Sequence, residues 1–297
     1  MTDVLRYAAF TNDPAGGNPA GVVLDASGLD ETAMRAIAAE VGYSETAFVT
    51  SQANDTFAVR YFSPESEVPF CGHATIATAV AYAERHRADE LRFDTSAGRV
   101  DVRVTNSGDG PLATLTSVPP HVDNVADEEV AEALAALGWQ PAELDPALPP
   151  RVAYAGARHL VLAAATRERL ADLDYDFARL RALMTARDWV TLALVFRRDH
   201  TTYDARNPFP TGGVVEDAAT GAAAAAFGAY LRALGAIDPP ARVTIHQGDD
   251  LGRPSLLLVD IPVGVETGIQ VSGRAVPIDQ AQEGSTSNSR SRRTTLT

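Results

Sequence analysis

The chain has 297 residues, 45% of them hydrophobic, and it carries a formal net charge of −14 at pH 7. This length is too great for most single hydrophobic cores and suits two domains of roughly 120 to 150 residues. The acidic balance argues against nucleic-acid binding, which needs a basic face. No lysine occurs, so Schiff-base chemistry by a lysine is excluded.

Signals for membranes, cofactors and metals are also missing. No uncharged apolar run approaches the roughly 18 residues of a membrane span, and the first residues lack the features of a signal peptide. We therefore expect a cytoplasmic protein without a membrane partner. The glycine-rich nucleotide-binding motifs do not occur, and the single cysteine excludes a disulfide and a cysteine-based zinc site. We expect no cofactor and no metal.

In the first part of the chain, strands and helices alternate. Alternating apolar residues predict strands at 4–10, 20–24, 57–62, 91–93 and 98–104. Apolar residues at helical spacing predict an amphipathic helix over 30–41. Segment 72–85 is apolar on all sides, which indicates a buried helix.

The second part repeats this arrangement. Strands are predicted at 152–154, 160–163, 190–196, 242–246 and 256–261, and a buried helix over 221–234. Arg60 precedes Gly72 as Arg206 precedes Gly221, each through a loop that contains proline. This correspondence favours a distant internal duplication.

Two lobes and a tail follow from these observations. The paired prolines Pro119 and Pro120 make 117–124 the best candidate linker, since they fit neither a helix interior nor a central strand. We predict an N-terminal lobe over 1–118 and a C-terminal lobe over 119–279, with a second crossover near Pro277. Residues 280–297 are polar and low in complexity, so we expect a disordered tail.

The two predicted buried helices begin alike. In each, a glycine opens an alanine-rich helix, Gly72 after Cys71 and Gly221 after Thr220. A glycine lets a ligand approach the backbone closely, and the unpaired N–H groups at a helix start favour a carboxylate or phosphate. Two such starts, one from each lobe, can face each other across a cleft and hold an anion.

Four segments carry a family resemblance: GNPAGV at 17–22, YSETAF at 43–48, CGHAT at 71–75 and EDAATG at 216–221. Together, and in this order, they resemble the phenazine-biosynthesis PhzF-like family, which is similar in fold to diaminopimelate epimerase. The resemblance implies an α+β fold of two pseudo-symmetric lobes, each a curved, mostly antiparallel sheet around a central helix. The active site is expected between the lobes, and we also expect a homodimer.

The resemblance implies a cofactor-independent isomerase that moves a proton between carbons of a small unsaturated or amino-bearing carboxylic acid. Glu45 matches the family's general acid/base, and His73 and Asp217 match its supporting catalytic residues. The expected substrate-binding residues are Asn18, Ser44, Gly72, Ala74, Thr220, Gly221 and Ala222. One departure stands at Ala222, where the family commonly has serine. The loss of that hydroxyl puts the family's best-known substrate, an amino-bearing dihydroxy-cyclohexadiene carboxylic acid, in doubt.

Each of these residues also has a purely structural interpretation. Glu45 could be a surface residue or a helix C-terminal partner, and His73 could be bonded to backbone at its helix start. Asp217 could be an N-terminal helix acid stabilised by the helix dipole, and Cys71 a small buried residue.

Two alternative functions stay open. Proline racemases of the same broad fold use two cysteines, but here Cys71 has Thr220 as its counterpart. This pair resembles the dehydratases of 3-hydroxyproline, in which one thiol removes an α-proton. The other alternative is a catalytically inactive protein that binds a metabolite, and its only support is Ala222.

Overall fold

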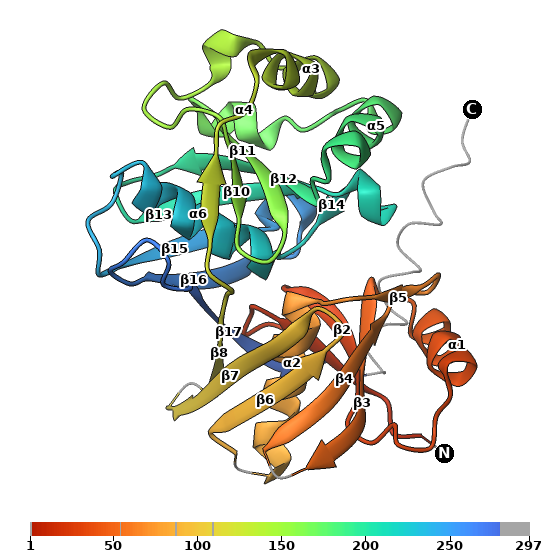
Figure 1. Ribbon diagram of the computed structural model, residues 1–297. Helices are drawn as coiled ribbons and strands as arrows, with labels where there is room; N and C mark the ends of the chain where they lie inside the picture. The colour runs from red at the N-terminus through yellow and green to blue at the C-terminus, as the bar shows by residue number, and fades with distance from the viewer. Residues whose placement is uncertain (1, 54, 87, 109, 280–297) are drawn as a thin grey trace.

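The computed structural model describes residues 2–279 other than 54, 87 and 109. Two lobes lie end to end, and each wraps a curved sheet around one central helix (Figure 1). These helices are α2 (Gly72–His86) in the first lobe and α6 (Gly221–Ala233) in the second. The predicted α+β fold of two pseudo-symmetric lobes is confirmed. The predicted tail, 280–297, lies outside the described residues.

As far as the structure describes it, the first lobe contains eight strands and the surface helix α1 (Glu31–Val41) besides α2. The strands are β1 (Leu5–Ala9), β2 (Asn18–Val23), β3 (Glu45–Ala53), β4 (Thr56–Phe62), β5 (Glu67–Val68), β6 (Glu90–Thr95), β7 (Gly98–Ser107) and β8 (Gly110–Thr116). Neighbouring strands pair antiparallel except for two parallel pairs, β2 with β3 and β4 with β6.

The second lobe repeats this plan. Its strands are β9 (His121–Asp123), β10 (Arg151–Tyr154), β11 (Arg158–Ala163), β12 (Thr191–Arg197), β13 (Thr202–Pro208), β14 (Glu216–Asp217), β15 (Ala241–Gln247) and β16 (Ser255–Ile261). The two parallel pairs are now β11 with β12 and β13 with β15. The matching positions of the parallel pairs support the internal duplication.

Short or peripheral helices complete the second lobe besides α6. They are α3 (Asp127–Leu137), α4 (Arg167–Ala171), α5 (Phe177–Arg187) and the 3₁₀ turns η1 (Pro141–Glu143) and η3 (Asp249–Leu251). A further 3₁₀ turn, η2 (Pro210–Gly212), leads toward β14. Helices α3 and α5 cover the outer face of the lobe around their own small core, which includes Trp139 and Trp189.

The last strand, β17 (Gln270–Pro277), joins the lobes. It pairs with β16 at its start and with β8 and β1 further on. The return to the first lobe therefore takes place within this strand, earlier than the predicted crossover near Pro277. The outgoing chain is also shorter than the predicted linker, because His121 already begins a strand beside β10. The lobe boundaries at 118 and 279 stay predictions.

Small side chains allow the sheets to close around the central helices. In α2, Ala74, Ala77 and Ala81 have no exposed surface. In α6, a Cβ atom added to Gly228 would lie 2.8 Å from a methyl carbon of Val259, so glycine is required there for close packing of helix on sheet. These two helices therefore serve as core, as their apolar composition predicts.

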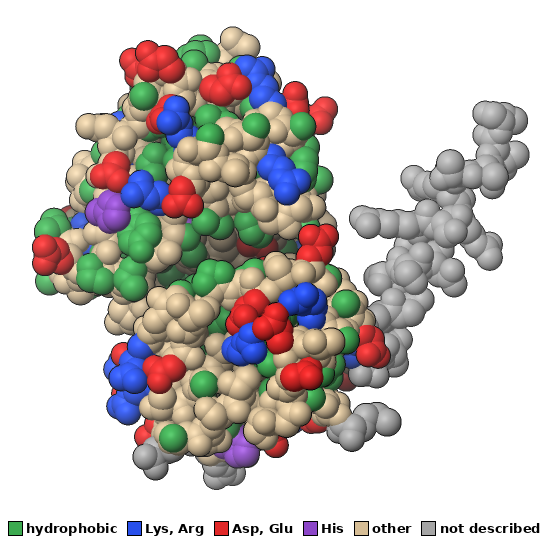
Figure 2. Space-filling model, turned by 45° about the vertical axis from the view of Figure 1, so that its right-hand side comes forward, with side chains coloured by type: hydrophobic (Ala, Val, Ile, Leu, Met, Phe, Trp, Pro, Cys, Tyr) green, Lys and Arg blue, Asp and Glu red, His purple; other side chains and the backbone are tan. Residues whose placement is uncertain are grey.

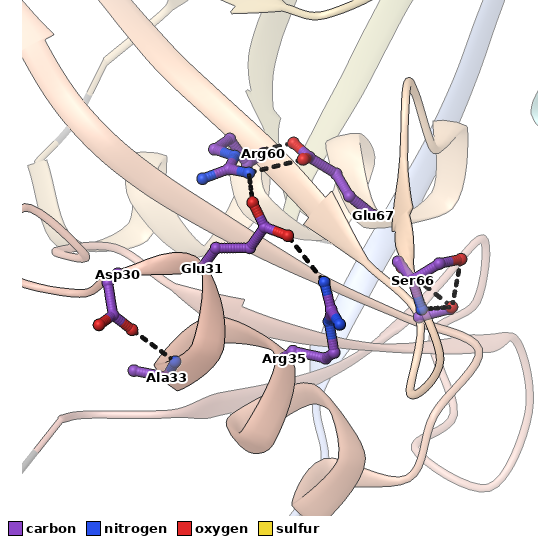
Figure 3. Close-up of polar contacts among 8 residues, drawn as sticks. Asp30, Glu31, Ala33, Arg35, Arg60, Ser66 and Glu67 are labelled. Atoms are coloured by element: carbon purple, nitrogen blue, oxygen red, sulfur yellow. Dashed lines mark hydrogen bonds and ion pairs between the residues drawn. The ribbon is translucent and has the colours of Figure 1, made fainter.

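Helix α1 lies on the outside and begins and ends with ordinary caps. The Asp30 carboxylate accepts a hydrogen bond of 2.8 Å from the Ala33 amide (Figure 3), and Gly42 ends the helix with φ of 72°. These are the cap residues that helix ends favour. Among the described residues, no helix combines the length and apolar composition needed to cross a membrane.

Candidate active site

The N-termini of α2 and α6 meet where the two lobes join. A Cβ atom built on Gly72 would lie 3.7 Å from the Gly221 Cα and 3.9 Å from the Ala222 nitrogen. The two helix starts therefore face each other, as predicted, but they touch. Because a single added methyl group would fill the gap between the two glycines, a carboxylate has no room directly between them. In the space-filling view a furrow separates the lobes (Figure 2).

Glu45 is the first residue of β3, opposite Ala20 in the parallel pair with β2. Its side chain is only 13% exposed, so it is not a surface residue. Burial raises the pKa of the Glu45 carboxyl, and hydrogen bonds from Ser44 and Cys71 oppose that rise. A carboxyl group in such surroundings titrates closer to neutrality than one in water.

His73 lies beside this carboxyl, in the first turn of α2. Its Nε2 is 3.4 Å from the Glu45 Oε2 and 3.4 Å from the Ser44 hydroxyl. Its Nδ1 lies 3.1 Å from the Asn18 amide nitrogen and 3.3 Å from the Cys71 sulfur. An amide nitrogen cannot accept a hydrogen bond, so a proton on Nδ1 would have only the Cys71 sulfur as acceptor, and this arrangement favours the ring tautomer with its proton on Nε2, toward Glu45. The partners of His73 are thus side chains, not backbone.

Asp217 comes from the second lobe and is joined to the first by Asn18. The Asn18 amide donates to the Asp217 Oδ1 at 2.7 Å and to the Ala219 carbonyl at 3.0 Å. The other carboxylate oxygen accepts from the Thr220 hydroxyl at 2.6 Å. Burial raises the pKa of Asp217, and the neighbouring His73 opposes that rise. Asp217 lies in β14, ahead of α6, so it is not a helix-start acid.

Burial acts on His73 in the opposite sense. It lowers the pKa of the imidazole, and the charge of Asp217 opposes that fall. Burial therefore pushes Glu45, Asp217 and His73 alike toward their neutral forms. A site of this kind can hold a proton on one group and pass it to another at neutral pH.

Gln247 supports the site and was missed by the sequence analysis. Its amide nitrogen donates to the Asp217 carbonyl at 2.9 Å and the Thr220 hydroxyl at 3.1 Å, and its carbonyl accepts from the Thr220 amide at 3.1 Å. This side chain is buried at the end of β15. The only signal in the sequence was a polar residue at a strand end before Gly248.

Cys71 completes the cluster. Its sulfur lies 3.6 Å from the Glu45 carboxylate, and burial, followed by the charge of Glu45, raises its thiol pKa well above the ordinary value. Glu45, Cys71 and His73 place one possible metal ligand each within 4.8 Å of one another, a grouping that no sequence spacing indicated. A cation would first have to displace the thiol proton.

The structure brings nearly all the predicted residues together. The exception is Ala74, whose side chain is fully buried in the core and whose amide donates to the Cys71 sulfur. Ala222 stays partly exposed at the start of α6. The residues that meet at the junction of the lobes are Asn18, Ser44, Glu45, Cys71, Gly72, His73, Asp217, Thr220, Gly221 and Ala222.

Comparisons with known proteins identify the family and the fold. The family model described as phenazine biosynthesis-like protein matches residues 7–281. The trans-2,3-dihydro-3-hydroxyanthranilate isomerase of Pseudomonas fluorescens is 32% identical over 93% of this chain and 97% of its own. An uncharacterized isomerase of Deinococcus radiodurans is 34% identical over 89% of this chain and 88% of its own. The crystal structure of a PhzF-family protein of Bacillus anthracis superposes with a TM-score of 0.83 at 26% identity, covering 94% of this chain and 97% of that one.

Proposed function

Because the chain belongs to the phenazine biosynthesis-like family, whose relatives are isomerases, we propose that it moves one proton between two carbons of a small unsaturated or amino-bearing carboxylic acid. The chain is an isomerase; the substrate class and the roles of individual residues are the proposal. Glu45 acts as the acid/base, and His73 and Asp217 support it. No cofactor takes part in this mechanism.

The environment of Glu45 carries the proposal. Its carboxyl is nearly buried, its pKa is raised, and the Nε2 of His73 lies 3.4 Å from it. A base that removes a proton from carbon and returns it elsewhere works best when its pKa is close to the working pH. Exclusion of water keeps the abstracted proton on the carboxyl until it is delivered.

One base also fits the asymmetry of the two lobes. Thr191 begins β12 opposite His159, as Glu45 begins β3 opposite Ala20, so the second lobe has a hydroxyl where the first has its carboxylate. Thr220 likewise stands opposite Cys71 and cannot serve as a base. A single carboxyl group suits transfer between two carbons on one face of a substrate. It does not suit a two-base inversion at one carbon.

The surrounding groups suit a substrate that has both a carboxylate and an amino or hydroxyl group. Backbone amides beside Gly72 and Gly221 offer donors for the carboxylate, and Asp217 is the acceptor for an amino group. Two of the curated relatives are named for trans-2,3-dihydro-3-hydroxyanthranilate, which has this combination. Since the side chains of Glu45 and His73 are 13% and 6% exposed, the lobes must part for a substrate to enter.

The test is the substitution Glu45→Gln, with Glu40→Gln as the matched control on the exposed face of α1. Turnover is measured on trans-2,3-dihydro-3-hydroxyanthranilate and on a panel of cyclic amino acids with a ring double bond. Loss of the proton carrier should lower kcat by roughly 10² to 10⁴-fold, whereas the control keeps wild-type rates. Near-wild-type turnover by a folded Glu45→Gln protein would show that another group moves the proton.

A further inference from the structure

Arg253 lies in the short loop between η3 and β16, and its side chain crosses to the first lobe. Its Nε donates to the Gly17 carbonyl at 2.8 Å, and its Nη2 donates to the Gly16 carbonyl at 2.6 Å. The backbone adds a third bond, from the Gly17 amide to the Pro254 carbonyl at 3.0 Å. All three bonds hold the two residues that come directly before Asn18.

The same loop also holds the segment that follows Asp217. The Ser255 hydroxyl donates to the Ala218 carbonyl at 3.2 Å. A Cβ atom added to Gly248 would lie 2.3 Å from the Arg253 carbonyl oxygen and 2.8 Å from that of Ala218, so these backbones are packed closely. Residues 253–255 thus touch the approach to Asn18 on one side and the exit from Asp217 on the other.

Gly16 and Gly17 lie so close to neighbouring backbone atoms that the chain has little room to form other bonds in place of these. Gly17 has φ of 64°, and a Cβ atom on it would lie 2.4 Å from the Ala9 carbonyl oxygen. A Cβ atom on Gly16 would lie 2.7 Å from the Pro254 carbonyl oxygen. Glycine is needed at both positions for the close approach to residues 253 and 254.

We propose that Arg253 is a positioning residue that fixes Asn18 between Asp217 and His73. This inference rests on the proposed function for its effect on turnover. Asn18 joins the two lobes through its hydrogen bond of 2.7 Å to the Asp217 carboxylate, and it lies 3.1 Å from the Nδ1 of His73 in its own lobe. Through these contacts Arg253 sets the tautomer of His73, and therefore the proton that faces Glu45.

The chemistry of the guanidinium supports this role. Burial lowers its pKa, and the charge of Asp13 opposes that fall. A partly desolvated cation is costly, but its planar fork is well shaped to donate to two neighbouring carbonyls at once. Tyr43, just ahead of Ser44 and Glu45, is close enough to affect the pKa of Arg253.

Arg232 provides a matched control. It too is half-buried, has a pKa lowered by burial, and, among the described residues, donates only to backbone carbonyls, those of Pro262, Val265 and Thr267. It lies in the last turn of α6, about 16 Å along the helix from Gly221 at 1.5 Å per residue. Loss of either arginine removes similar bonds, but only Arg253 is bonded next to the site.

The experiment compares Arg253→Met with Arg232→Met in the full-length chain. Thermal unfolding should show similar losses of stability. Turnover is measured on whichever compound of the panel described above the wild-type protein converts. It should fall by roughly 10- to 100-fold in Arg253→Met alone, since small displacements of catalytic groups have effects of that size. Arg253→Lys, which keeps the charge without the fork, should resemble Arg253→Met. Wild-type turnover in Arg253→Met, or equal losses in both methionine variants, would overturn the proposal.

A second measurement needs no substrate. Histidine ring nitrogens are labelled with ¹⁵N, and the His73 signals are assigned by their loss in His73→Gln. We expect the Nε2–H tautomer in the wild type and in Arg232→Met, and a mixture of tautomers in Arg253→Met. Unchanged His73 signals in Arg253→Met would refute the positioning role, even if the test at Glu45 fails. If Glu45→Gln stays active while the signals change as expected, only the proposed function is wrong.

Discussion

At the scale of single residues, one environment has opposite consequences for two neighbouring groups. Burial raises the pKa of both Glu45 and Cys71. A carboxyl begins at about 4.3 and moves toward neutrality, whereas a thiol begins at about 8.5 and moves away from it. The same pocket therefore makes Glu45 a better base at neutral pH and Cys71 a worse one.

This difference favours the proposed isomerase mechanism over the alternative in which Cys71 removes an α-proton. We predict that Cys71→Ala keeps most of the activity and loses about 1 kcal/mol of unfolding free energy, as is usual for a small buried change. The checks are kcat/KM on the wild-type substrate and urea unfolding. A folded but inactive Cys71→Ala protein would support the thiol mechanism and contradict the role of Glu45 as the acid/base.

The sequence was informative about residues whose side-chain chemistry, together with a motif, indicates a role in the site. Glu45, His73 and Asp217 were predicted from motifs, and the structure places all three at the junction of the lobes. Whether they act as proposed is untested. Gln247 and Arg253 could not be predicted, because they act by bonds to backbone groups that lie far away in sequence. No spacing along the chain reports such contacts.

At the scale of elements, prediction succeeded where one face of a segment is uniformly buried. The helix expected over 72–85 is α2, and the one expected over 221–234 is α6. Strand β3 was missed because its alternation breaks: residues 46–49 are all buried, 51–53 are exposed, and a register shift separates Val49 from Ser51. Helix α5 was missed because only Leu180 and Met184 are buried in it.

The meeting of two helix starts leads to a prediction about anion binding. A Cβ atom at Gly72 would meet the Gly221 Cα at 3.7 Å, an ordinary contact, but would lie over the start of α6. We expect Gly72→Ala to fold and to bind anthranilate, a carboxylate probe, roughly 10- to 100-fold more weakly, the effect of losing one hydrogen bond to a charged group.

Isothermal titration measures this affinity. Gly28→Ala is the control, because nothing lies within 4 Å of a Cβ atom at that exposed turn. Gly221→Val is a poorer choice, since its Cβ would also come within 3.3 Å of the Phe10 ring and destabilise the fold. If Gly72→Ala binds anthranilate as tightly as the wild type, the carboxylate binds elsewhere.

At the scale of the whole molecule, the two lobes contain equivalent ion pairs that are buried to different depths. In the first lobe Arg60, in β4, forms a two-bond pair with Glu67, in β5 (Figure 3). In the second lobe Arg206, in β13, forms the same pair with Glu216, in β14. Each pair ties the strand before the central helix to its neighbour. The duplication was visible in the sequence through these arginines, but their burial was not.

The exposures of the two pairs differ greatly. The side chains of Arg60 and Glu67 are 32% and 31% exposed. Water and the nearby carboxylate of Glu31 therefore also stabilise the Arg60 guanidinium. The side chains of Arg206 and Glu216 are 10% and 1% exposed, and Arg206 also donates to the Ala171 carbonyl. If Glu216 loses its charge, the guanidinium is left buried and uncompensated. In the first lobe, solvent compensates for the same loss.

We therefore predict unequal effects of one substitution made in each lobe. Glu216→Gln should lower the free energy of unfolding by about 3 to 5 kcal/mol, the range for breaking one side of a buried pair. Glu67→Gln should lower it by about 1 kcal/mol or less, as for exposed pairs. Urea unfolding followed by circular dichroism measures both. Equal losses would mean that the duplicated pairs serve the same structural purpose despite their different burial.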